Sequence, residues 1–223
     1  HANDIGSSLI TNFGITAERK DGFTLRITEE EFDLPLPALP GRHQFINAAT
    51  AITAARYAGI PDITGPDLAI IARGISQAIW PARLQKLFTG PLCDALPEGC
   101  ELILDGGHNI AAAEVIADWL SRQPKGDTVA IMGMLDNRDP VAFLQPLASY
   151  ITSFAGIPIP GDHEVHSADT LRDAAATARI ANAHACETLD DALAVLKNAV
   201  AKPKRVLILG SLYLAGVVLE NHA

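Results

Sequence analysis

The sequence predicts an α/β protein: a mostly parallel sheet with helices on both faces, preceded by a smaller region of strands and helices. After about residue 85, short apolar runs alternate with longer segments of helical periodicity, a pattern typical of parallel sheets. Before residue 80, strand-like alternation comes first and two helix-like segments follow. Pro81 stops the second of these helices between the two patterns, so we expect domains at 1–80 and 81–223.

Composition restricts the class of protein. At 223 residues, with 48% hydrophobic and 19% charged, the chain suits one large or two small soluble domains. Its net charge of −9 argues against nucleic acid or an anionic membrane surface as partner. Three cysteines without a common zinc spacing favour a reducing compartment, and we expect a cytoplasmic protein. The most apolar run, 206–219, is too short to span a bilayer.

The first region is expected to contain strands followed by two helices. Asp21-Gly22 is typical of a hairpin turn, and Gly59 is placed to end an Ala-rich helix. In chain order we expect strands joined by turns over 5–37, with alternation at 23–27 and 32–39, a helix over 43–57, a loop over 60–66 and a helix over 67–79.

The second region is expected to alternate strands and helices. The predicted strands are 85–88, 101–104, 128–132, 150–155, 185–187 and 205–209. The predicted helices run from 110 to about 122, 140–148, 168–179, 190–201 and from 211 onward.

The stretch Glu101–Asn109 is the strongest candidate for a functional site. Its first four residues predict a buried strand, so Asp105 stands at the strand's carboxyl end, where open α/β sheets bind ligands. Two glycines follow and allow a tight turn, and Asn109 suits the start of the next helix. An ordinary turn, with Asp105 and Asn109 capping the helix and His108 on the surface, is the alternative. Because Asn also caps helices, we expect Asp105→Asn to leave the melting temperature normal.

Two further strand ends carry polar residues. Gly133–Asp139 follows the strand predicted at 128–132, and Ser211 follows the one at 205–209. If these strands are neighbours, Asp105, His108, Asp136 and Ser211 line one edge of the sheet. Helix capping and a solvated loop are the alternatives for the acidic residues of the second corner, and capping of the last helix is the alternative for Ser211.

Several familiar sites are absent from the sequence. There is no G-x-x-x-x-G-K-[ST] phosphate loop, no G-x-G-x-x-G and no nucleophile elbow. His163 and His166 lie among acidic residues, but without a regular ligand spacing. We therefore interpret that stretch as a solvated loop and assign no metal ligand within the chain.

Five motifs, taken in order, resemble one known family. They are Leu39-Pro-Gly-Arg-His-Gln with Asn47, Trp80-Pro-Ala-Arg-Leu-Gln85, Leu104-Asp-Gly-Gly-His-Asn109, Gly133-Met-Leu-Asp-Asn-Arg-Asp139 and Gly210-Ser-Leu-Tyr-Leu214. This set resembles the carboxyl-terminal half of folylpolyglutamate synthase/dihydrofolate synthase, of the Mur ligase superfamily, over about residues 35–220. The resemblance implies a Rossmann-like C-terminal ligase domain at 81–223, preceded by the end of a central ATPase domain at 1–80.

The resemblance implies an ATP-dependent ligase that adds L-glutamate to dihydropteroate or folate through an acyl phosphate. ATP, L-glutamate and the dihydropteroate or folate would be its small-molecule partners, with Mg²⁺ as a further requirement. The phosphate loop and the Mg²⁺ ligands would lie upstream of residue 1, in the N-terminal ATPase portion of the same protein, so the chain alone is expected to be inactive. The alternatives are another Mur-type ligase acting on a cell-wall precursor, or a non-catalytic module of the same fold.

The resemblance also suggests roles for individual residues. Asn47, Arg83 and Asp105 match positions that contact ATP. His108 and Ser211 match positions associated with the incoming glutamate. Arg83 can pair with phosphate, and a carboxylate can accept hydrogen bonds from ribose hydroxyls or an amine.

Three positions depart from the usual family pattern. Gly107 and Ile110 stand where the family usually has Ala and Pro, and Ala82 stands where it usually has Gly. These changes affect the expected geometry of the turns.

Overall fold

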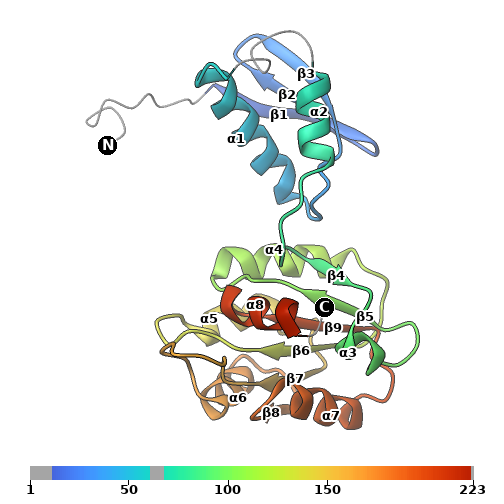
Figure 1. The fold of residues 1–223 in the computed structure, drawn as a ribbon, viewed down its shortest axis with the longest axis vertical. Coiled ribbons are helices and arrows are strands. Elements are labelled where there is room, and N and C mark those ends of the chain that lie inside the picture. The colour runs from blue at the N-terminus through green and yellow to red at the C-terminus, as the bar shows by residue number, and fades with distance from the viewer. Residues whose placement is uncertain (1–11, 61–67, 222–223) are drawn as a thin grey trace. The chain divides into compact units, whose positions relative to one another are not determined.

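The chain divides into two compact units, His1–Trp80 and Pro81–Ala223 (Figure 1). The computed structural model describes residues 12–60 and 68–221. The strand character expected for residues 5–11, the loop expected at 61–66 and the helix start expected at Asp67 lie outside the described residues.

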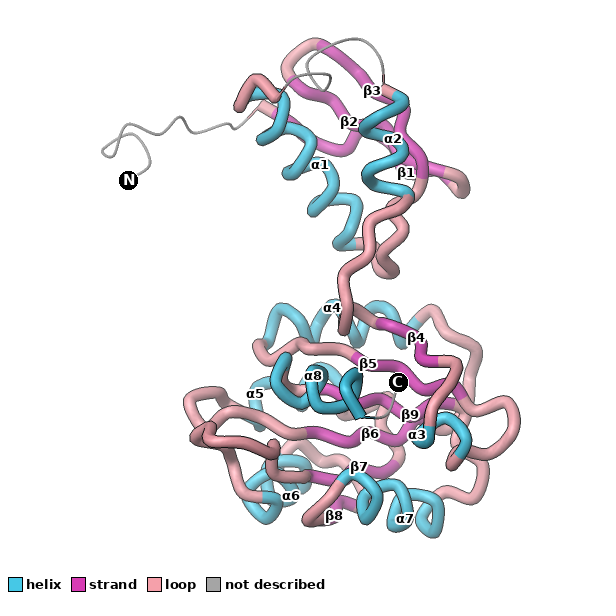
Figure 2. The backbone as a smooth tube through the Cα atoms, in the orientation of Figure 1, coloured by secondary structure: helices cyan, strands magenta, loops and turns pink. Residues whose placement is uncertain are grey.

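The first unit is a three-stranded antiparallel sheet with two helices (Figure 2). Its strands, in spatial order, are β1 (Phe13–Arg19), β2 (Gly22–Ile27) and β3 (Glu30–Pro35). Its helices are α1 (His43–Tyr57) and α2 (Ala69–Ser76). The bounds predicted for α1 are confirmed, and Gly59 follows it with φ +66°.

Strand alternation explains how this unit builds its core. Phe23, Leu25 and Ile27 are buried on one face of β2 and form a cluster with apolar residues of β3, α1 and α2. On the other face, the Thr24 hydroxyl and then the Arg19 guanidinium hydrogen-bond the Asp33 carboxylate and lower its pKa. The period of two therefore separates an apolar face from a polar one.

The second unit has a six-stranded sheet in the order β4-β5-β9-β6-β7-β8. The strands are β4 (Gln85–Leu87), β5 (Glu101–Leu104), β6 (Thr128–Met132), β7 (Ser153–Gly156), β8 (Ala183–Ala185) and β9 (Arg205–Leu209). Only the edge strand β4 pairs antiparallel, so the prediction of a mostly parallel sheet is confirmed.

Helices cover both faces of this sheet, as predicted (Figure 1). They are α3 (Pro91–Asp94), α4 (Ile110–Ser121), α5 (Pro140–Leu144) with the 3₁₀ turn η2 (Gln145–Leu147), α6 (Ala168–Thr177), α7 (Leu189–Ala199) and α8 (Leu212–Asn221). One apolar cluster joins α3, α7 and α8 to the sheet, and a second joins α4, α5 and α6 to the opposite face. No helix in the described ranges is long and apolar enough to cross a membrane.

Some predicted boundaries were wrong. The helix expected over 140–148 is divided into α5 and η2, because Pro146 has no N–H to continue the α-helical ladder. β7 begins later than expected, at Ser153 opposite Val129 of β6, and β8 begins earlier, at Ala183 opposite Phe154 of β7. β3 likewise starts and ends earlier than the predicted 32–39, and α3 was not predicted at all.

The amino ends of the central strands carry a charged cluster that serves the fold. Arg205, only 2% exposed, donates to the Pro124 carbonyl at 2.6 Å and lies 3.5 Å from the Glu101 carboxylate. Lys86 donates to Glu101 at 2.8 Å, and this hydrogen bond is the main reason that the pKa of Glu101 is lowered. The candidate corners lie at the other end of the same strands.

Candidate functional site

The three polar corners meet at one edge of the sheet, because β5, β9 and β6 are adjacent strands. Asp105 N donates to Ile208 O at 2.9 Å, which joins the first corner to the end of β9. Gly210 N donates to Gly107 O at 3.0 Å, and Gly133 N donates to Leu209 O at 3.3 Å. The three strands are therefore neighbours, as a shared edge requires. Backbone hydrogen bonds join each corner to the next.

Asp105 holds the first corner together with both of its carboxylate oxygens. The side chain is 8% exposed; Oδ1 accepts from Gly107 N at 2.7 Å and Oδ2 from Leu84 N at 2.8 Å. The cap of α4 is instead Asn109, whose Oδ1 accepts from Ala112 N at 2.9 Å. The proposed cap at Asn109 is confirmed, and the alternative of Asp105 as a second cap is wrong.

Arg83 lies against the same corner. Gly106 N donates to Ala82 O at 2.9 Å, and a Cβ added to Gly106 would be 3.5 Å from Arg83 Nη1. Apart from one long bond, from Nη1 to its neighbour Ala82 O at 3.3 Å, the half-buried guanidinium has no hydrogen-bond partner among the described residues. It can therefore pair with an anionic ligand at this edge.

The backbone on either side of Arg83 is in the left-handed region. Ala82 has φ +55° and Leu84 has φ +46°. Gly adopts this region without the steric cost of a Cβ, so the Gly that the resembling family usually has at position 82 would avoid this strain. The Gln85 side chain supports the turn, since its Oε1 accepts from Ala82 N at 2.8 Å.

His108 has a defined tautomer in its neutral form. Its Nδ1 is 3.0 Å from Gly106 O, and because a carbonyl can only accept, Nδ1 carries the proton. Nε2 has no hydrogen-bond partner among the described residues and is available as an acceptor. The ring is half-buried beside the loop that also contacts Arg83.

Ser211 is both a helix cap and a member of the edge. It is 3% exposed, and its Oγ accepts from Tyr213 N at 3.0 Å in the first turn of α8. The capping alternative is therefore correct, but an accepting hydroxyl still has its own proton to donate. Through the bond from Gly210 to Gly107, the serine is attached to the corner of Asp105 and His108.

The acidic residues of the second corner have other roles. Asp139 caps α5, with Oδ1 accepting from Val141 N and Ala142 N at 3.0 Å each. The alternative of helix capping is therefore correct for this residue. Asp136 is exposed, and its backbone N–H donates to Glu164 O at 3.1 Å. Nothing in these contacts assigns Asp136 to a ligand.

The two loop histidines are held by separate contacts. The His163 ring stacks on Tyr213 with centroids 3.8 Å apart, and His166 Nε2 donates to Arg138 O at 2.8 Å. Among the described residues, no three His, Cys, Asp or Glu side chains are grouped to hold a metal ion. No step is therefore assigned to a metal bound by this part of the chain.

Asn47 belongs to the first unit, on α1. Its side chain is exposed, and Nδ2 donates to Gln44 Oε1 at 3.0 Å. The other four predicted site residues, Arg83, Asp105, His108 and Ser211, are brought together within the second unit.

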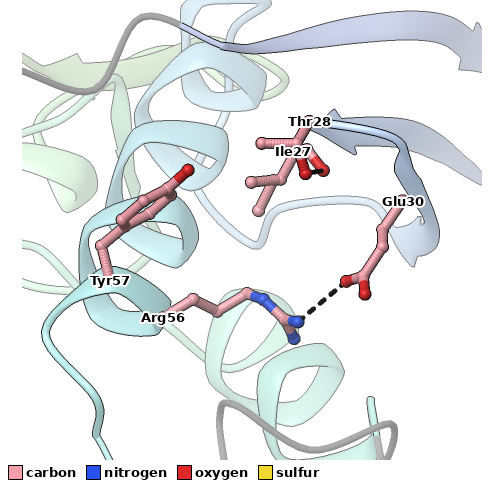
Figure 3. A pocket seen from close by; sticks show the side chains of 5 residues that line it. All are labelled: Ile27, Thr28, Glu30, Arg56 and Tyr57. Carbon is pink, nitrogen blue, oxygen red and sulfur yellow. Dashed lines mark hydrogen bonds and ion pairs between the residues drawn. The ribbon is translucent and has the colours of Figure 1, made fainter.

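The first unit also has a hollow of about 320 Å³ lined by Ile27, Thr28, Glu30, Arg56 and Tyr57 (Figure 3). Arg56 donates to Glu30 at 3.0 Å, as the dashed line in Figure 3 marks, and its guanidinium lies 4.6 Å from the centroid of the Phe32 ring. Because the cation is already paired and none of the predicted site residues lines the hollow, it is separate from the candidate site.

Sequence reasoning did not identify the partners that hold the site residues. Leu84 contributes only its backbone N–H, which no residue-type pattern can reveal. Gln44 and Gln85 were inside the quoted motifs, but nothing in the sequence indicated that Gln44 bonds the Asn47 amide or that Gln85 bonds the Ala82 backbone N–H.

Comparisons with known proteins agree on one family. The model of the family described as "Mur ligase, glutamate ligase domain" matches residues 92–212. A probable bifunctional folylpolyglutamate synthase/dihydropteroate synthase of Haloferax volcanii is 31% identical over 85% of this chain and 21% of that protein. The folylpolyglutamate synthase of Lacticaseibacillus casei is 27% identical over 94% of this chain and 46% of that protein.

A solved structure gives the same result. E. coli FolC in complex with DHPP and ADP is 26% identical, with a TM-score of 0.77 over 98% of this chain and 48% of that one. The chain thus spans less than half the length of each of these proteins.

Proposed function

Because the chain belongs to the Mur ligase family through its glutamate ligase domain, we propose that it serves an ATP-dependent ligase that adds L-glutamate to a folate-type carboxylate. The observation that carries this proposal is the meeting of three strand ends, which places Arg83, Asp105, His108 and Ser211 on one edge. Its similarity to folylpolyglutamate synthases, and to a solved relative that holds DHPP and ADP, supports the same activity. No observation on the described residues favours a cell-wall ligase or a non-catalytic module.

In this proposal the site residues divide between two ligands. Asn47, Arg83 and Asp105 serve ATP: Arg83 pairs with phosphate, and Asp105 shapes the loop beside it through its bonds to the Leu84 and Gly107 backbone. His108 and Ser211 receive glutamate. His108 Nε2 can accept a proton from the ammonium group, and the Ser211 hydroxyl can donate to a carboxylate.

The proposed reaction is an acyl transfer. The terminal phosphoryl group of ATP passes to the folate-type carboxylate, the glutamate amine attacks the acyl carbon, and phosphate leaves. We propose that residues 1–80 end the central ATPase domain, that residues 81–223 are the C-terminal ligase domain, and that Mg²⁺ is bound by a portion of the ligase outside this chain. The chain's span of 46% and 48% of two relatives supports its role as one part of a longer ligase.

The chain alone is expected to show no glutamate-dependent turnover. Its 223 residues contain no G-x-x-x-x-G-K-[ST] phosphate loop to hold the transferred phosphoryl group. The measurement is product formation from dihydropteroate or folate with ATP, Mg²⁺ and glutamate. The longer ligase that includes this sequence is the positive control. Turnover by the isolated chain would show that its own residues complete the active site.

In the longer ligase, His108→Ala is expected to raise the KM for glutamate by roughly tenfold to a hundredfold, or to lower kcat, with ATP affinity nearly unchanged. The reason is the loss of one charge-assisted hydrogen bond to the amino acid. His184→Ala is the matched control, because His184 lies on β8 at the far edge of the sheet from β5. A loss confined to ATP affinity would place His108 at the nucleotide instead.

A further inference from the structure

The first turn of α1 contains a buried glutamine whose side chain is bonded at both ends. Gln44 is 4% exposed; its Oε1 accepts from Asn47 Nδ2 at 3.0 Å and its Nε2 is 2.8 Å from His43 Nε2. Since an amide nitrogen only donates, His43 Nε2 is the acceptor in this pair, and the proton of the neutral ring lies on Nδ1. Turning either amide by 180° would therefore place donor against donor or acceptor against acceptor.

This arrangement determines what Asn47 offers to a ligand. One hydrogen of Nδ2 is used by Gln44, while Oδ1 has no hydrogen-bond partner among the described residues. The residue is exposed on the outer side of the helix, so its free acceptor can be reached from solution. An exposed asparagine without such a partner would present oxygen and nitrogen interchangeably.

We propose that Gln44 is a positioning residue that holds the Asn47 amide with Oδ1 directed at the nucleotide, and so selects a base that offers a hydrogen-bond donor there. The inference rests on the proposed function, which places Asn47 at ATP. A base with an acceptor at that position leaves Oδ1 facing a lone pair. The expected preference for the donor-bearing base is roughly tenfold to a hundredfold.

Two nucleotides and two variants test this inference. ATP carries an amino group at position 6 of its base, whereas ITP carries a carbonyl oxygen there. Gln44→Met keeps the length of the side chain but removes both hydrogen bonds, so the preference for ATP should fall to within about threefold. Gln44→Glu still accepts from Asn47 Nδ2 and should keep it. Gln77→Met, the same chemical change at an exposed position of the same unit, is the matched control.

The first measurement needs no nucleotide and uses the full 223-residue chain. In ¹⁵N NMR spectra, His43 Nε2 should have the shift of an unprotonated ring nitrogen. The Asn47 side-chain amide should be well ordered in the parent and in Gln77→Met, but not in Gln44→Met. A mobile Asn47 amide in the parent would overturn the positioning role, whatever the chain binds.

The second measurement titrates ATP and ITP separately, without metal, while the Asn47 side-chain amide is observed. Preference for ATP in the parent, its loss in Gln44→Met and its retention in Gln44→Glu would support the inference. Binding of ATP with equal affinity for ITP, or a preference unchanged in Gln44→Met, would overturn the positioning role and leave the proposed function standing. An ordered Asn47 amide that neither nucleotide perturbs would overturn the assignment of Asn47 to ATP, and the inference with it.

Discussion

Gly210→Ala is expected to destabilise the second unit by about 2–6 kcal/mol, the sum of a steric and a backbone term. Gly210 has φ +103°, a region that side-chain-bearing residues rarely adopt. A Cβ there would lie 2.6 Å from both Gly133 O and Met132 Cγ, so the corners after β6 and β9 would be forced apart. Because Ser211 follows directly, the change should also separate the serine from Asp105 and His108.

Thermal unfolding of the whole chain measures this effect, with an expected decrease in Tm on the order of 5–20 °C. Gly216→Ala is the matched control, because nothing lies within 4 Å of the Cβ it would add on α8. Within a helix that change is expected to stabilise by about 0.5–1 kcal/mol. A Tm for Gly210→Ala within a degree of the parent would mean that the two corners are not packed as the structure shows.

Asp105→Asn is expected to lower the stability of the second unit by about 2–4 kcal/mol, and also to impair the use of ATP in the longer ligase. Sequence reasoning had predicted a normal melting temperature, because Asn can replace Asp as a cap. The structure changes this expectation, since each carboxylate oxygen accepts from a different backbone N–H, those of Gly107 and Leu84. Asn has one oxygen, so its NH₂ group must face one of two buried donors.

Asn109→Ala is the control for this prediction, because it removes a true helix cap four residues away. Loss of a cap costs about 1 kcal/mol, and ATP use should not change. Calorimetry of the chain and steady-state kinetics of the longer ligase separate the two effects. If Asp105→Asn melted like the parent, the two-donor geometry would be wrong. If the kinetics of Asp105→Asn with ATP equalled those of the parent ligase, Asp105 would have only a structural role.

Short-range signals determined much of the local structure. The bounds of β5, β6 and β9 were predicted from apolar runs that stop at polar or glycine residues. The bounds of α1 and the cap at Asn109 also follow from neighbouring residues. The family's usual Pro at position 110 has a local reason too, since Ile110 is the first residue of α4, where Pro is favoured.

The ends of the outer strands could not be read in the same way. β7 begins where it pairs with β6 and β8 begins where it pairs with β7, and their apolar runs do not mark these points. The division between α5 and η2 has a local cause in Pro146. The apolar periodicity, which continues through this residue, predicted a single helix instead. Strand length is thus a property of the pair, whereas a helix depends mainly on its own residues.

By itself, the sequence determined that this is an α/β chain with polar residues at three strand ends, because burial periodicity and turn chemistry act over a few residues. Only the tertiary structure decided that β9 lies between β5 and β6, which joins Ser211 to the corner of Asp105. It also decided that Asp105 accepts from the backbone of Leu84. Strand order depends on pairing between distant segments, and a backbone N–H is the same whichever side chain its residue carries, so neither leaves a local signal.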